Sequence, residues 1–137
     1  MRLSDINVAV GILSGIKINR LADKRVKAVL LNDYLALRPS FKRAKEDVEE
    51  MRAKFQQDWS DELDAVQALR DKGRPVVGHD AYLVAERDAN KAIDDILSAE
   101  VDVDIKSVPM DDFINICGGE DLTLEQVAFL QQVGVVE

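Results

Sequence analysis

The sequence contains few of the residues that build disulfides, metal centres and aromatic cores. Its 137 residues include one cysteine, one histidine, three prolines and seven glycines, and 5% are aromatic. One cysteine excludes an intramolecular disulfide and a thiolate zinc cluster. With one histidine, the sequence argues against every metal or general-base site that needs two histidines. The small share of proline and glycine excludes a Pro/Gly-rich coil, and the small share of aromatics predicts a mainly aliphatic core.

Long hydrophobic runs are also missing. The uncharged stretch from Ile6 to Ile16 is too short to span a bilayer. It follows Ser-Asp rather than a basic region and has no clear small-residue cleavage site, so we do not expect a signal peptide. We expect a soluble intracellular protein, and a single cysteine, Cys117, agrees with a reducing compartment.

The charge is acidic overall and unevenly distributed. The net charge is −8, with a balance of +5 over residues 1–54, −3 over 55–85 and −10 over 86–137. An acidic chain is repelled by phosphate backbones unless its charge is segregated, as it is here. The composition, with 47% hydrophobic and 32% charged residues, is that of a folded protein, and the length predicts a single domain.

The strongest structural signal is a long helix over residues 23–58. Apolar residues recur there at alternating spacings of three and four, which is typical of a coiled coil or helix bundle. They are Val26, Leu30, Tyr34, Leu37, Phe41, Ala44, Val48, Met51 and Phe55. Pro39 removes a backbone donor and predicts a kink or a break near 37–38. The apolar pattern keeps its phase across Pro39, which favours a kinked, continuous helix.

The remaining elements are shorter. We expect a first helix capped by Ser4 and stopped by Gly15, and further helices over about 60–72, 80–98, 110–117 and 123–133. Thr123 and Gln126 have capping-box spacing. Residues 101–106 alternate between apolar and charged residues, which predicts a half-buried strand paired with 16–18 or with 76–77.

The sequence therefore predicts a mainly α fold: a long kinked helical hairpin or bundle with a minimal two-stranded β element. The long apolar stripe is wider than one small chain can cover, so we expect self-association, most simply a dimer.

Two sets of charged residues are candidate binding surfaces. The acidic set, expected to contact a protein partner, is Asp102, Asp104, Asp111, Asp112, Glu120 and Asp121. A basic set is a candidate for nucleic-acid or acidic-partner contacts and comprises Lys17, Arg20, Lys24, Arg25, Lys27, Arg38, Lys42 and Arg43. Two other interpretations remain. Both sets could be solvated helix and strand faces without a partner, or the basic part could contact the acidic part within the fold or in an oligomer.

No pattern indicates catalysis. There is no nucleophile with a positioned base, no metal quartet, no EF-hand spacing and no phosphate-binding glycine loop. We therefore expect a non-enzymatic protein without a cofactor or metal. Trp59 is either a core anchor or a partner-facing aromatic residue.

The order of these features resembles the small helical proteins of unknown function encoded by tailed phages and prophages. The resemblance rests on an apolar first helix, the long charged helix over 26–55, and the patterns at 96–105 and 122–130. It implies an accessory role, as a virion component or an inhibitor of a host protein, located in the host cytoplasm or the virion. It brings no catalytic residues.

Overall fold

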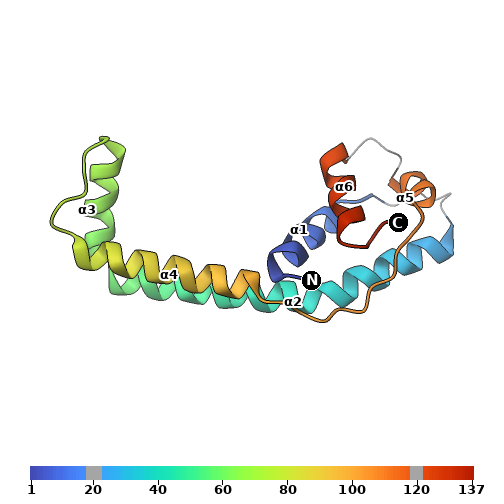
Figure 1. The fold of residues 1–137 in the computed structure, drawn as a ribbon, viewed down its shortest axis with the longest axis horizontal. Helices are drawn as coiled ribbons and strands as arrows, with labels where there is room; N and C mark the ends of the chain where they lie inside the picture. Colours follow the sequence, from blue (N-terminus) through green and yellow to red (C-terminus); the bar gives the residue numbers. More distant parts are fainter. Residues whose placement is uncertain (18–22, 118–121) are drawn as a thin grey trace. The chain divides into compact units, whose positions relative to one another are not determined.

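The computed structural model describes residues 1–17, 23–117 and 122–137. Within them the protein is mainly helical, as predicted, with six α-helices and no strand. The helices are α1 (Leu3–Ser14), α2 (Lys24–Asp58), α3 (Ser60–Asp71), α4 (Asp80–Ser98), α5 (Met110–Cys117) and α6 (Leu124–Gln132) (Figure 1). The chain divides into two compact units, Met1–Arg43 with Ala99–Glu137, and Ala44–Ser98. The single domain expected from the length stays a prediction.

The long helix α2 begins one residue later than expected and ends at the expected residue. Its nine apolar stripe residues are all buried or half-buried. The helix runs through Pro39 without interruption, so the predicted alternative of a break is wrong. The apolar residues keep the same side of the helix before and after Pro39, and their burial holds the helix together across the missing backbone donor. A kink at Pro39 stays a prediction.

The first unit has an aliphatic core to which four helices and the C-terminal tail contribute. Figure 1 shows α1, α5 and α6 gathered beside the N-terminal part of α2. The buried side chains are Ile6, Ala9, Val10, Ile12, Leu13, Leu30, Leu37, Val108, Phe113, Ile116, Leu130, Val135 and Val136. Burying one large apolar side chain is worth about 1.5–3 kcal/mol, so this cluster supplies the main stabilisation of the unit.

The prediction of a strand over 101–106 is wrong, although half-buried and exposed residues do alternate there. Val101, Val103 and Ile105 are half-buried against the core, and Asp102, Asp104 and Lys106 are exposed. The segment is extended but has no ladder, because it lies along helices whose backbone groups are already paired. Every second residue faces the core, which produces a strand-like pattern without a sheet.

The ends of this segment are held by backbone hydrogen bonds to the chain termini. Near its start, Leu3 N donates to Ala99 O at 3.0 Å and Val101 N donates to Met1 O at 2.9 Å. Beyond its end, Val108 N donates to Val135 O and Glu137 N donates to Val108 O. These contacts are isolated bridges, Arg2 with Glu100 and Val108 with Val136. The expected partners at 16–18 and 76–77 are therefore wrong where described, and residue 18 lies outside the described residues.

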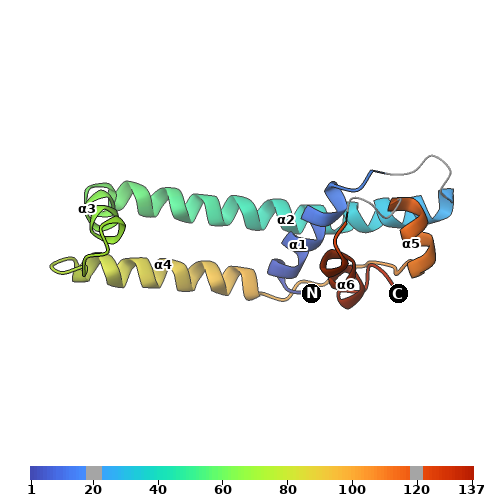
Figure 2. The same ribbon diagram turned by 90° about the horizontal axis from the view of Figure 1, so that it is seen from above.

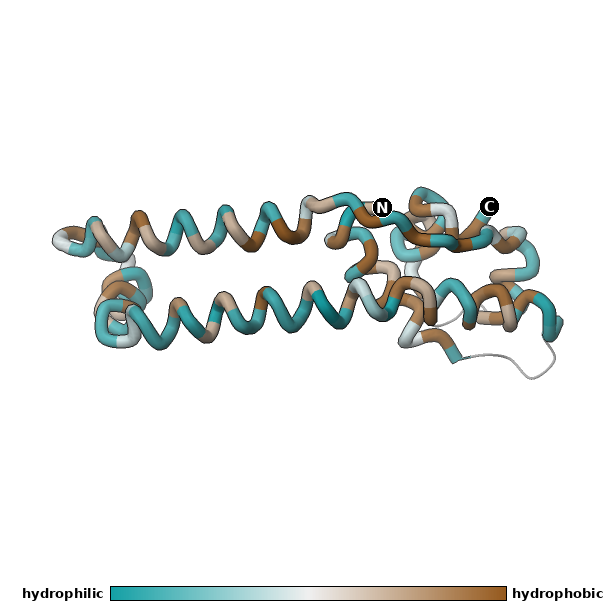
Figure 3. The backbone as a smooth tube through the Cα atoms, turned by 90° about the horizontal axis from the view of Figure 1, so that it is seen from below, coloured by the Kyte–Doolittle hydropathy of each residue, from teal (hydrophilic) through white to brown (hydrophobic). Residues whose placement is uncertain are grey.

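The second unit contains the C-terminal part of α2 together with α3 and α4. Figure 2 shows α4 running antiparallel to this part of α2. Val48, Val66, Tyr82 and Ile93 are buried, and hydrophobic residues alternate with hydrophilic ones along both helices (Figure 3). Trp59 is half-buried and meets Tyr82 edge-on, with ring centroids 6.0 Å apart. It therefore contributes to the packing of its own unit.

The helix ends are capped differently from one another. Thr123 caps α6 with the expected capping box: Gln126 N donates to Thr123 Oγ1 at 3.2 Å, and Thr123 N donates to Gln126 Oε1 at 2.9 Å. Ser4, expected to cap α1, lies inside its first turn, and the N-cap residue is Arg2 without a side-chain cap bond. The main-chain bond from Leu3 to Ala99 already fixes where α1 begins.

We expect Thr123→Ala to lower the free energy of unfolding by about 0.5–2 kcal/mol, because it removes one half of the capping box. The matched control is Ser4→Ala, which removes a hydroxyl from a helix start but no cap, and should change the stability by less than about 0.5 kcal/mol. Urea unfolding of both variants measures the two values. Equal losses would contradict the assignment of the caps.

Candidate functional site

The described acidic candidates lie in two neighbouring stretches of the first unit. Asp102 and Asp104 are exposed on the extended segment, Asp111 is exposed in the first turn of α5, and Asp112 is half-buried beside it. None of the four forms an ion pair within the described ranges. Glu120 and Asp121 lie outside the described residues. The four described residues are called the acidic surface below.

The described basic candidates lie at the end of α1 and along α2. Lys17 follows α1, and the others lie in the first 20 residues of α2. Those exposed are Lys17, Lys24, Arg25, Arg38, Lys42 and Arg43, whereas Lys27 is half-buried. Arg20 lies outside the described residues. The set does not form one cluster, because Leu31 and Leu35 are exposed between its two parts.

A buried carboxylate in α2 connects the acidic surface to the fold. Asp33 is 2% exposed, and its Oδ1 accepts a hydrogen bond of 2.8 Å from Lys106 N. Its Oδ2 is buried and has no partner in the described part of the chain. Burial raises the pKa of Asp33, and the nearby Asp104 adds to this, while the bond from Lys106 N and the Lys106 charge oppose it.

Sequence reasoning missed Asp33, although a signal was present. Residues 30, 33 and 37 share one side of a helix, so an aspartate between Leu30 and Leu37 falls on the buried stripe. A carboxylate in that position requires a polar partner from another segment. That partner comes from residue 106, far along the chain, and no local pattern identifies it.

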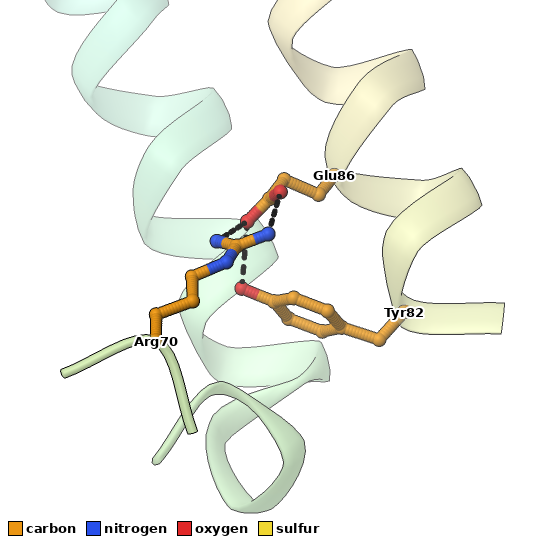
Figure 4. A network of polar contacts seen from close by, with 3 residues as sticks. All are labelled: Arg70, Tyr82 and Glu86. Carbon is orange, nitrogen blue, oxygen red and sulfur yellow. Dashed lines mark hydrogen bonds and ion pairs between the residues drawn. The ribbon is translucent and has the colours of Figure 1, made fainter. Parts of the chain in front are cut away.

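The second unit holds a polar network between α3 and α4 (Figure 4). Arg70 donates two hydrogen bonds to Glu86, at 2.8 and 2.9 Å, and Tyr82 Oη donates to Glu86 Oε2 at 3.1 Å. The bond from Arg70 lowers the pKa of Glu86, and burial together with Glu86 raises the pKa of Tyr82. These groups satisfy one another, so the network ties α3 to α4.

The lone histidine has a similar structural role. His79 Nδ1 lies 3.5 Å from Glu62 Oε2, which connects the start of α4 to α3. Among the described residues no group of three or more histidine, cysteine or acidic side chains is arranged to hold a metal ion. None of the described helices has both the length and the hydropathy needed to cross a membrane.

Comparison with known proteins gives no relative: no family model, curated protein or solved structure matches this chain.

The buried position of Asp33 predicts a particular pH dependence of stability. Because its pKa is raised in the folded chain, the folded state binds the proton more tightly than the unfolded state. The contribution of Asp33 to stability therefore falls as the pH rises from the pKa of an unfolded aspartate, about 3.9, through the raised pKa of Asp33 in the folded chain. Asp33→Asn keeps an acceptor for Lys106 N but cannot ionise. We expect wild type to gain stability relative to Asp33→Asn as the pH falls from about 7 to about 4.

Urea unfolding of wild type and Asp33→Asn across this pH range gives the difference directly. Asn32→Gln is the matched control, because it changes an exposed side chain next to Asp33 that has no ionisable group. Its difference from wild type should stay nearly constant with pH. A constant difference for Asp33→Asn as well would rule out a buried carboxylate at this position.

Proposed function

We propose that this chain is a non-enzymatic protein that binds another protein through its acidic surface. The observation that carries the proposal is the way the extended segment is fixed. Its two ends are bonded to the chain termini, its last residue, Lys106, is bonded to Asp33, and its apolar residues face the core. Asp102 and Asp104 are thereby held outward on an ordered backbone.

Order in the free protein favours binding. A surface that is already fixed loses little conformational entropy on association, so more of the interaction energy appears as affinity. Four carboxylates without ion pairs in the described structure complement a basic groove, which speeds encounter and excludes acidic partners. A protein whose groove normally holds phosphates fits this description.

The resemblance to small phage and prophage proteins gives the proposal its setting. There the protein would act as a virion component or as an inhibitor of a host protein, in the host cytoplasm or the virion, without a cofactor.

We also propose that the C-terminal part of α2 and α4 form the helical hairpin expected from the sequence. The contacts of Tyr82 with Phe55 and Trp59 support this pairing.

Nucleic-acid binding is the second candidate. The observation that favours it is the exposure of six basic side chains at the end of α1 and on α2. Phosphate contacts of this kind are released by salt and depend on intact nucleic acid. A nuclease treatment therefore separates this candidate from the first.

The test is affinity capture from a bacterial lysate with and without nuclease, read by mass spectrometry. We expect a protein partner that wild type retains under both conditions. Reversing Asp102, Asp104, Asp111 and Asp112 to lysine should reduce its retention at least about tenfold, because attraction becomes repulsion.

The control variant carries the same change of charge elsewhere. Asp47, Asp64, Asp88 and Asp95 are exposed in the second unit, and their reversal to lysine should leave retention unchanged. Circular dichroism checks that both variants fold. Undiminished retention by the first variant would contradict the proposal, and retention that nuclease abolishes would transfer the function to the basic residues.

A further inference from the structure

The side of α2 that faces away from the core of the first unit is apolar at its centre and basic at its ends. Leu31 is 54% exposed and Leu35 is 50% exposed, and they are neighbours one helical turn apart. Lys24, Arg38 and Lys42 project from the same side of the helix, at 3.6 residues per turn. These five residues are called the α2 outer face below.

A hollow adjoins the apolar centre of this face. It has a volume of about 230 Å³ and lies between the end of α1 and the N-terminal part of α2. Its lining residues are Leu13, Ser14, Ile16, Leu30, Leu31 and Tyr34. Adjacent exposed apolar side chains with an apolar hollow are typical of a protein-binding surface, and scattered single ones are not.

The charge around the hollow selects an acidic occupant. In the described residues 11–17 and 23–43, only Asp23 and Asp33 are acidic, and seven side chains are basic. Asp23 accepts a bond of 2.7 Å from Arg25 N, and Asp33 is buried. An occupant must therefore offer apolar side chains together with exposed carboxylates.

The same unit also carries these features on α5 and α6. Ile114 is 48% exposed and lies one turn after Asp111 on α5, and Leu124 is 90% exposed beside Glu125 at the start of α6. Together with the acidic surface they combine exposed apolar side chains with carboxylates. A second copy of the chain thus provides the chemistry that the α2 outer face requires.

Within one molecule, Asp102 and Asp104 lie away from the α2 outer face. Asp33 projects about 160° away from Leu31 and Leu35 around the helix axis. Because Asp33 bonds to Lys106 N, the segment that carries Asp102 and Asp104 lies on that opposite side. Asp102 and Asp104 are therefore on the opposite side of α2 from Leu31 and Leu35, so these residues meet only between different molecules.

We propose that the α2 outer face of one molecule binds the acidic surface of the next, with Ile114 and Leu124 meeting Leu31, Leu35 and the hollow. This inference rests on the proposed function, because it assigns a second copy as a partner of the acidic surface. Because Asp102 and Asp104 lie on the opposite side of α2 from its outer face, this contact is head-to-tail and does not close as a two-fold dimer. Copies therefore associate into open chains or rings, in place of the dimer expected from the sequence.

Sedimentation velocity of the full chain over a wide range of concentration tests the inference. The mean mass should rise with concentration beyond that of two copies. Raising the ionic strength from about 0.1 M to about 1 M shortens the Debye length from about 10 Å to about 3 Å and should weaken the association. A protein that stays monomeric at every concentration would overturn the inference.

Two variants test which surfaces meet. The outer-face variant Leu31→Ser, Leu35→Ser loses its apolar centre, and the acidic-surface variant reverses Asp102, Asp104, Asp111 and Asp112 to lysine. Each alone should associate at least about tenfold more weakly than wild type. When the two variants are mixed, the acidic surface of the outer-face variant binds the outer face of the acidic-surface variant. Growth then stops at a complex of two molecules.

The mixture distinguishes head-to-tail contact from the alternatives. If outer faces paired with each other, the acidic-surface variant would dimerise alone, which would overturn the inference. Val77→Ser, Val84→Ser is the matched control, since both residues are exposed in the second unit and their loss should leave association unchanged. Circular dichroism confirms that all variants fold.

A second charge variant tests the basic ends of the outer face. Lys24→Glu, Arg38→Glu, Lys42→Glu should weaken association, whereas the same change at Lys54, Lys72 and Lys91 of the second unit should not. Equal effects of the two variants would overturn the inference.

The results separate this inference from the proposed function. In one outcome, the protein stays monomeric and captures a nuclease-resistant partner through the acidic surface. This rejects the second copy as the occupant and retains the proposed function. Self-association that both variants abolish, with no captured protein other than the chain itself, supports the second copy as partner and rejects a host target.

Discussion

The hydrogen bond from Lys106 N to Asp33 ties the extended segment of the first unit to its longest helix. The segment has no ladder along its length, and its other described backbone bonds to the rest of the unit lie near its two ends. A polar side chain in α2 therefore fixes the last residue of the segment, Lys106. The arrangement buries a carboxylate, one oxygen of which has no partner in the described structure, which costs stability, and the apolar cluster around it offsets that cost.

This bond also determines how the charge of the unit is distributed. With Val103 and Ile105 directed to the core and Lys106 N directed to α2, Asp102 and Asp104 face outward. The opposite side of α2 is left with two exposed leucines between basic residues. Helix α2 thus lies between Asp102 and Asp104 on one side and two exposed leucines with basic neighbours on the other. The proposed binding role and the head-to-tail association both depend on that separation.

The helices could be predicted well because their signals are local. Thr123 and Gln126 marked the start of α6, and the spacing of three and four marked α2 through Pro39. The extended segment was misinterpreted because alternation reports which residues are buried and not what they are buried against. Its true partners, the chain termini and Asp33, are distant in sequence. The charged candidate residues were visible from composition. Asp33 also falls on the predicted apolar stripe, but its partner, the backbone of Lys106, is not indicated by any local pattern.

Amide hydrogen exchange at Lys106, followed by NMR, tests the central claim most directly. The account predicts that the Lys106 amide exchanges far more slowly than the amides of Asp104 and Ser107, which have no acceptor within the described structure. Exchange of Lys106 as fast as that of these two neighbours would show that Asp33 does not hold the segment. The acidic surface would then lack the fixed backbone on which the proposed function depends.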